Sequence, residues 1–446
     1  MAAARGEFSS RFGFLMAASG SAVGLGNIWG FPTNTASNGG AAFLFTYLIL
    51  TLVLAYPALM AELIIGRHAR ANAVTALKSI STGPKSKLAA VAVGFTGIVT
   101  VTFILSFYAV VSGWMIAFFL DPLARMLGMD AVAGWLTEDT VVRNGIFVVV
   151  FMLLTVVIIS AGVKDGIEKW ASRLMPSLVG ILLLLILYVL TLPGAMDGLR
   201  AYLVPDFSRA LNPQLLVDAM GQAFFSLSLG VGTMLVYGSY ISKHENLPML
   251  GGLVALLDVG IAVLAGLLIL PAMYVALASG VEIFDESGGL IAGPGLIISV
   301  LPALFNNMGF MGILVALAFF SLMTIASLTS SISMLEVPVA YAVEVHKVGR
   351  RRAAASIGLV ITAISLLIVF NFDPMFDLVV TYTTEFSQPL LGFFFCIFVA
   401  WIWHRNDALN EIKQGFPEAE MGWFWKIWPF YVKFICPLAI LLVYFQ

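Results

Sequence analysis

Residues 19–34, SGSAVGLGNIWGFPTN, decide the fold because they lie inside the first long apolar segment and yet make a poor continuous helix. Glycine costs a helix about 1 kcal/mol relative to alanine, and four glycines fall within eleven positions here: Gly20, Gly24, Gly26 and Gly30. Pro32 adds a break shortly after them. We therefore expect the helix to open within this stretch.

An opened helix in a bilayer leaves N–H and C=O groups that lipid cannot satisfy. Such a segment persists only where it is buried in protein or lines a polar cavity. A binding site at residues 19–34 is therefore one interpretation. The alternative is that the glycines only let helices pack closely, as small residues do in membrane bundles.

Composition places the chain among membrane proteins. Of its 446 residues, 60% are hydrophobic and 11% are charged, and the mean hydropathy is +0.99. This is too apolar for a soluble domain and too long for a single anchor. A net charge of −2 gives no basic face for nucleic acid, so we expect no nucleic-acid partner.

Apolar stretches of about 20 residues predict an all-α membrane protein with eleven spans. They are 12–37, 41–66, 88–120, 144–160, 166–191, 214–241, 248–277, 309–342, 354–371, 375–403 and 424–445. The connecting segments hold 18 Lys and Arg on one side and 4 on the other. The positive-inside rule then places the N-terminus in the cytoplasm and the C-terminus outside.

Span six repeats the anomaly of span one, because residues 225–232, FSLSLGVG, place glycines in its middle. Glycine-interrupted helices at corresponding positions of two halves indicate a transporter built from inverted repeats, with its site at their interface. We expect one transmembrane domain over 1–446. Its repeats would span about 12–191 and about 214–403, with an extra helix at about 424–445.

Ionisable groups within spans are functional candidates by default, and they include Glu62, Asp258, Glu336 and Glu385. For Glu62 we favour a structural role, in which the carboxylate accepts N–H bonds from an opened helix, over a transport role. The hydroxyls of residues 326–333, ASLTSSIS, are either interhelical glue or ligands for a hard cation. The histidines all fall at cytoplasmic ends, which argues against an enzyme: His68, His244, His346 and His404.

These features together resemble one family, the neurotransmitter:sodium symporters, also called sodium- and chloride-dependent neurotransmitter transporters, in their bacterial amino-acid branch. The matching motifs are SAVGLGNIWGFP at 21–32, NGG at 38–40, FFSLSLGVG at 224–232 and LTSSIS at 328–333, with Glu62, Gly66, Arg67, Tyr108 and Trp114. The resemblance implies a 5+5 inverted repeat with discontinuous helices one and six.

The resemblance also implies two sodium sites. The first would use the substrate carboxylate together with Ala22, Asn27, Ser226 and Asp258. The second would use the carbonyls of Gly20, Val23 and Ala326 and the hydroxyls of Thr329 and Ser330. Oxygen ligands of this kind suit hard cations.

An amino-acid carboxylate is expected at the N–H groups of Leu25 and Gly26, with the Tyr108 hydroxyl donating. The half-helix that begins there would aim its positive dipole end at the anion. The remainder of the implied substrate site comprises Ser21, Ala22, Ile104, Phe225, Ser226, Ser228, Val231, Ser330 and Met334. Several of these are aliphatic, which suits an apolar substrate side chain.

Positions that close the cytoplasmic side in the family match Arg5, Phe8, Ser239, Tyr240 and Glu344, although Phe8 replaces the usual Trp. The outer side departs from the pattern. The family commonly pairs an Arg at the position of Gly30 with an acid in span ten, but residues 379–384 contain no acid. The outer gate is therefore expected to depend on Tyr108 and Phe225, or on a rearranged contact of Glu385.

The sequence thus predicts a sodium-coupled importer of neutral, hydrophobic amino acids that works by alternating access in the inner (plasma) membrane. Two sodium ions are expected and no chloride, because Asp258 stands where chloride-dependent relatives have Asn. The alternatives are a symporter for another small zwitterion, similar to taurine or GABA, a ligand sensor on a transporter scaffold, and an ion channel. The expected partners are the amino-acid substrate and the lipid bilayer.

Overall fold

The computed structural model describes residues 6–38, 40–204, 213–284, 290–291 and 295–444. In this part of the chain, nine helical segments are long and apolar enough to cross a membrane. They are α3–α4 (Ala41–Ala69), α6 (Pro84–Met126), α8 (Val141–Ser160), η3–α9 (Val163–Val189), α13 (Leu247–Ala278), α16 (Gly309–Val345), α17 (Arg350–Phe370), α18–η6 (Phe372–Ile402) and α21–α22 (Trp423–Leu442).

A tenth span is broken. It consists of α1 (Arg11–Ala22) followed by the π-helix η1 (Gly26–Gly30) and α2 (Phe31–Ser37), and the two parts are bent by 71°. The opening is narrower than residues 19–34, because only residues 23–25 separate the helices. Pro32 does not end a helix here. The helix continues through it, because the π-helix η1 runs directly into α2.

The predicted sixth span, 214–241, is two short helices, α11 (Pro213–Ser226) and α12 (Thr233–Gly238). Neither helix is long enough to cross a bilayer alone, so this discontinuous span is not counted among the nine unbroken candidates and the one broken candidate of the described residues. The helix stops because Ser228, Gly230 and Gly232 adopt positive φ angles of 52°, 85° and 79°. The all-α membrane fold with discontinuous spans one and six is otherwise confirmed.

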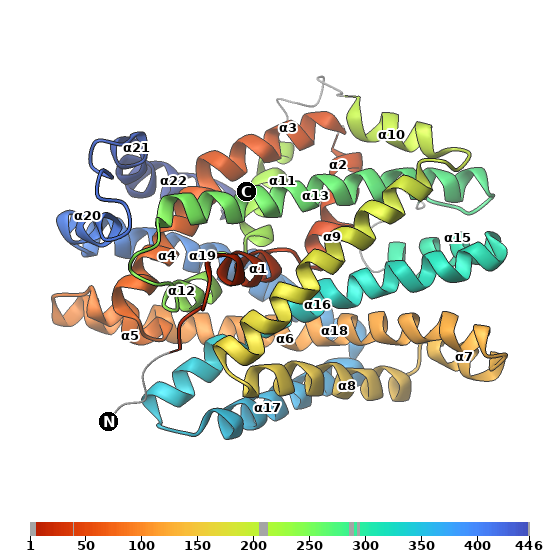
Figure 1. Cartoon of the computed structure of the whole chain (residues 1–446), viewed down its shortest axis with the longest axis horizontal. Helices are drawn as coiled ribbons and strands as arrows, with labels where there is room; N and C mark the ends of the chain where they lie inside the picture. The colour runs from red at the N-terminus through yellow and green to blue at the C-terminus, as the bar shows by residue number, and fades with distance from the viewer. Residues whose placement is uncertain (1–5, 39, 205–212, 285–289, 292–294, 445–446) are drawn as a thin grey trace.

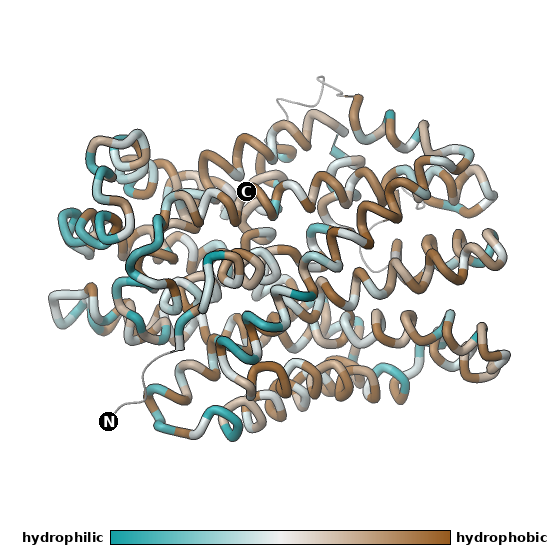
Figure 2. Tube along the Cα trace, in the orientation of Figure 1, coloured by the Kyte–Doolittle hydropathy of each residue, from teal (hydrophilic) through white to brown (hydrophobic). Residues whose placement is uncertain are grey.

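Short helices alternate between the two ends of the spans. α5 (Ala73–Ser79) and α20 (Arg405–Lys413) lie at one end, and α7 (Asp130–Thr137), α10 (Ala195–Leu203) and α15 (Leu301–Asn307) lie at the other (Figure 1). Figure 2 shows hydrophilic residues gathered at the end that carries α5 and α20. The connections therefore alternate as the sequence predicts.

The spans pack in two groups that meet at the broken helices. α6, α8, α16 and α17 all pack on one another, and α4 packs with α12 and α13. α1 contacts α13 of one group and α16 of the other. The break in span one is therefore held between the two groups.

Candidate substrate and cation sites

The break in span one exposes main-chain groups that side chains then satisfy. The N–H of Gly24 donates to Asn27 Oδ1 at 3.1 Å, and the N–H of Leu25 donates to the Tyr108 hydroxyl at 3.3 Å. Gly24 leaves little room for a side chain, because an added Cβ would lie 2.9 Å from Ser330 Oγ and 3.0 Å from the Tyr108 oxygen. The predicted carboxylate position thus has its N–H group and its hydroxyl side by side.

The break in span six is supported by two buried polar side chains. Glu62 accepts from the N–H of Gly230 at 2.7 Å and from that of Leu235 at 3.3 Å, as its structural interpretation requires. Gln388, which the sequence analysis did not single out, donates to the Leu229 carbonyl at 2.9 Å. Gln388 is uncharged, so it does not stand out among the ionisable residues of the spans. Only the polarity of its amide within an apolar span could have indicated a functional role.

One oxygen cluster joins the two breaks to α13. The side-chain nitrogen of Asn27 lies 2.7 Å from Ser226 Oγ and 2.8 Å from Asp258 Oδ1, and Ser226 Oγ lies 2.7 Å from Asp258 Oδ2. Tyr47, which was not predicted, adds its hydroxyl at 3.3 Å from Ser226 Oγ. These residues fit the first sodium site in chemistry, although the amide nitrogen of Asn27 rather than its oxygen faces the carboxylate.

A second cluster forms where α1 ends against α16. Ser330 Oγ donates to the carbonyls of Gly20 and Val23, both at 3.1 Å. Thr329 Oγ1 bonds the Ala326 carbonyl at 3.1 Å, and its Cβ lies 3.0 Å from where a Cβ on Gly20 would be. The five residues expected around the second sodium are therefore neighbours, at the negative end of the α1 dipole.

A cavity lies between these clusters. It contains about 30 Å³ of space open to water, room for two or three molecules. Its lining includes every predicted substrate residue except Ser226, namely Ser21, Ala22, Leu25, Gly26, Ile104, Tyr108, Phe225, Ser228, Val231, Ser330 and Met334. Ser226 is absent from the lining because its hydroxyl is held in the Asp258 cluster. The lining also contains Gly24, Asn27, Val101, Thr233 and Gln388.

The side of the cavity toward α11 is closed by packing and an amide hydrogen bond. The Phe225 ring would lie 2.5 Å from a Cβ on Gly26, so it sits directly against the break. Gln222 Nε2 donates to the Gly26 carbonyl at 3.2 Å. Its Oε1 lies 3.9 Å from where a Cβ on Gly30 would be. Glu385 is exposed. Tyr108 and Phe225 therefore both lie at the break in span one, and their role as the outer gate stays a prediction.

At the end of the spans that carries α5 and α20, the segment before α1 packs on the end of span six. The N–H of Phe8 donates to the Tyr240 carbonyl at 3.1 Å, and their rings meet edge to face. The Tyr240 hydroxyl donates to Glu336 at 2.5 Å.

Glu344 accepts from the main chain of Asn72 at 2.8 Å, and Ser239 donates to the Val236 carbonyl. Arg5, the remaining predicted gate residue, lies outside the described residues.

A further contact at this side was not predicted. Glu168, at the start of span five, accepts from the N–H and the hydroxyl of Ser9, both at 2.7 Å, and from Ser10 Oγ at 3.1 Å. Gly13 allows this approach, since an added Cβ would overlap the Glu168 carboxylate. The N-terminal segment is therefore tied to span five as well as to span six.

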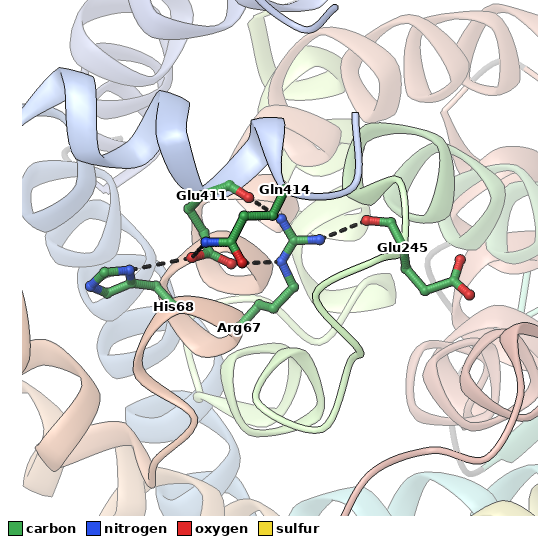
Figure 3. A network of polar contacts seen from close by, with 5 residues as sticks. All are labelled: Arg67, His68, Glu245, Glu411 and Gln414. Atoms are coloured by element: carbon green, nitrogen blue, oxygen red, sulfur yellow. Dashed lines mark hydrogen bonds and ion pairs between the residues drawn. The ribbon is translucent and has the colours of Figure 1, made fainter. Parts of the chain in front are cut away.

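Figure 3 shows a buried polar network around Arg67, in the last turn of α4. Arg67 Nε lies 2.8 Å from Glu411 Oε1 and Nη1 lies 2.6 Å from the Glu245 carbonyl, while His68 and Gln414 also reach Glu411. Burial alone would raise the pKa of Glu411. The hydrogen bond with His68 and the charge of Arg67 outweigh it and hold that pKa below its ordinary value. The network fastens α20 to α4.

A cavity between two opened helices, with main-chain and side-chain oxygens on both flanks, is typical of ion-coupled transporters. The sequence model of the sodium:neurotransmitter symporter family matches residues 5–146 and 136–446 of this chain. The uncharacterised sodium-dependent transporter YhdH of Bacillus subtilis is 32% identical over 453 residues, which cover 98% of this chain and 96% of the relative.

Two further relatives are informative. The sodium- and chloride-dependent taurine transporter of Bos taurus is 26% identical over 97% of this chain and 77% of its own length. The crystal structure of MhsT in complex with L-phenylalanine is similar with a TM-score of 0.84 and 36% identity, over 99% of both chains. The chain belongs to the sodium:neurotransmitter symporter family and is a sodium-dependent transporter rather than an enzyme.

Proposed function

We propose that this protein imports neutral amino acids with apolar side chains, coupled to sodium and by alternating access. The observation that carries the proposal is the position of the Asn27–Ser226–Asp258 cluster beside the cavity where the Leu25 N–H meets the Tyr108 hydroxyl. A substrate carboxylate there would take the place of the Leu25–Tyr108 hydrogen bond. The bound phenylalanine of MhsT supports the same class of substrate.

Two sodium ions are the cargo that accompanies the substrate in this proposal. Asn27, Ser226 and Asp258 would hold the first ion, and Ser330 with the Gly20 carbonyl would hold part of the second. One ion entering down about 100 mV and a tenfold gradient releases roughly 3.7 kcal/mol, enough to concentrate a zwitterion about 500-fold. Two ions raise this to about 10⁵-fold, which suits uptake from dilute surroundings.

The fixed carboxylate of Asp258 supports transport without chloride, because it supplies negative charge beside the first ion.

We place the protein in the inner (plasma) membrane with a cytoplasmic N-terminus and an external C-terminus, on the strength of the Lys and Arg distribution. The two breaks support repeats of about 12–191 and 214–403, with the last helix outside them.

A small zwitterion such as taurine is the second candidate, because the taurine transporter of Bos taurus is a relative. Ile104, Val231 and Met334 in the cavity wall favour the amino acid, since taurine has no side chain to contact them. The test is uptake into proteoliposomes with an inward sodium gradient, for a panel of amino acids and taurine. Accumulation of neutral amino acids supports the proposal, whereas accumulation of taurine alone, or of nothing, overturns it.

A further inference from the structure

One polar side chain in the cavity wall has a group without a partner. Gln388, the first residue of α19 (Gln388–Ile397), lines the cavity and is only 5% exposed. Its Nε2 donates to the Leu229 carbonyl, whereas its Oε1 is buried and has no hydrogen-bond partner among the described residues. Buried acceptors in native proteins normally have partners.

The orientation of this amide is fixed by its surroundings. Exchanging its nitrogen and oxygen would bring the Gln388 oxygen against the Leu229 carbonyl, two acceptors with no proton between them. The main-chain oxygen of Gln388 lies 2.2 Å from where a Cβ on Gly230 would be, so α19 is seated directly on the break of span six. Oε1 is therefore held as an acceptor.

Other hydroxyls in the cavity wall already have partners within the protein. Ser21 donates to Ser333 at 2.7 Å, Ser228 to the Ser21 carbonyl at 2.9 Å, and Thr233 to the Ser228 carbonyl at 3.0 Å. Since these donors are engaged, none of the three supplies a proton to Gln388 Oε1, and a molecule bound in the cavity can supply one.

The anchor of Gln388 indicates which part of the substrate it meets. Leu229 is two residues before Val231, one of the apolar residues of the cavity wall, whereas the carboxylate position is at Leu25 and Tyr108. We infer that Gln388 Oε1 accepts a hydrogen bond from the substrate side chain. The site then prefers neutral amino acids whose largely apolar side chain carries one N–H or O–H donor, such as an indole or a phenol. This inference rests on the proposed function.

The test uses two pairs of ligands that differ in the donor. Tryptophan is compared with β-(3-benzothienyl)alanine, in which sulfur replaces the indole N–H, and tyrosine is compared with phenylalanine. Binding to the purified full-length protein is measured in Na⁺. In at least one pair the unmodified protein should prefer the donor member by about five- to tenfold, the range of one hydrogen bond. Gln388→Met, which keeps the bulk and removes the acceptor, should reduce this preference to less than about twofold.

A matched control is Gln222→Met. Gln222 is also a buried glutamine that donates to a carbonyl at a break, that of Gly26, but it lies outside the cavity lining. Its variant should keep the preference of the unmodified protein. Phenylalanine binding reports whether each variant is folded, and Gln388→Leu provides a second variant.

The inference is overturned if the unmodified protein shows no preference in either pair, or if the preference survives in both Gln388 variants. Gln388 would then only support the break in span six. Absence of sodium-dependent binding for all four amino acids is a different result, because it overturns the proposed function itself.

Discussion

The side-chain nitrogen of Asn27 lies 2.8 Å from a carboxylate oxygen of Asp258, although the two residues are 231 positions apart in the chain. Asn27 belongs to the π-helix η1, directly after the opening in span one, and Asp258 to the middle of α13. The contact places a fully buried acid beside the main-chain groups that the break exposes. The Asn27–Asp258 contact therefore places a carboxylate next to the main-chain groups at the break in span one.

The first prediction concerns chloride. Uncompensated charge in a low-dielectric site costs several kcal/mol, and the Asp258 carboxylate can offset the charge of the accompanying ions. Uptake by the unmodified protein should be equal in chloride and in gluconate. Asp258→Asn should either abolish transport or make it depend on chloride. Strong chloride dependence of the unmodified protein would show that Asp258 does not have this role.

The second prediction concerns the close approach at Gly24. Gly24→Ala would place a methyl group 2.9 Å from Ser330 Oγ and 3.0 Å from the Tyr108 oxygen, at the expected carboxylate position. Overpacking of this kind costs about 1 to 3 kcal/mol, so amino-acid binding should weaken about fivefold or more. Gly180→Ala in α9 is the control, because nothing lies within 4 Å of its added Cβ. Equal affinity of the two variants would contradict the geometry.

The third prediction concerns Glu62. Glu62→Ala leaves the N–H groups of Gly230 and Leu235 without their acceptor, at a cost of about 1 to 3 kcal/mol each. The unfolding temperature in detergent should fall clearly, while Glu385→Ala, at an exposed position, should leave it nearly unchanged. Stability of Glu62→Ala equal to that of the control variant would argue against the structural role.

The fourth prediction concerns pH. Because the pKa of Glu411 is lowered in the folded state, its contacts stabilise the protein fully above the pKa of an unfolded glutamate, about 4.3. This stabilisation is lost as the pH falls through the lower folded pKa. Glu411→Gln should therefore reduce thermal stability at pH 7, and the difference from the unmodified protein should shrink as the pH drops below about 4. A difference that does not change with pH would contradict this.

Much of this arrangement was predictable from residue type. Glycine at spans one and six predicted two breaks, because glycine is a poor helix former. The extent of the first break was overestimated, since Gly26 and Gly30 are accommodated in the π-helix η1 and Pro32 in the first turn of α2. Local propensity cannot show that a helix resumes when tertiary packing supports it.

The supporting polar groups were harder to predict. Tyr47 reads as an ordinary aromatic core residue, and Gln388 and Gln222 carry no charge within their apolar spans. Their roles depend on which carbonyls the breaks turn toward them, as with Leu229 and Gly26. That information lies in the packing between spans distant in the chain.

Sodium dependence of amino-acid binding tests the central claim most directly. The first ion and the substrate carboxylate are proposed to share one site, so each must raise the affinity of the other by the same factor. The measurement is the affinity of the purified protein for a neutral amino acid in Na⁺, K⁺ and choline, together with Na⁺ affinity with and without that amino acid. We predict tight amino-acid binding only in Na⁺ and an equal, reciprocal increase in Na⁺ affinity. Equal amino-acid affinity in all three salts would contradict the account.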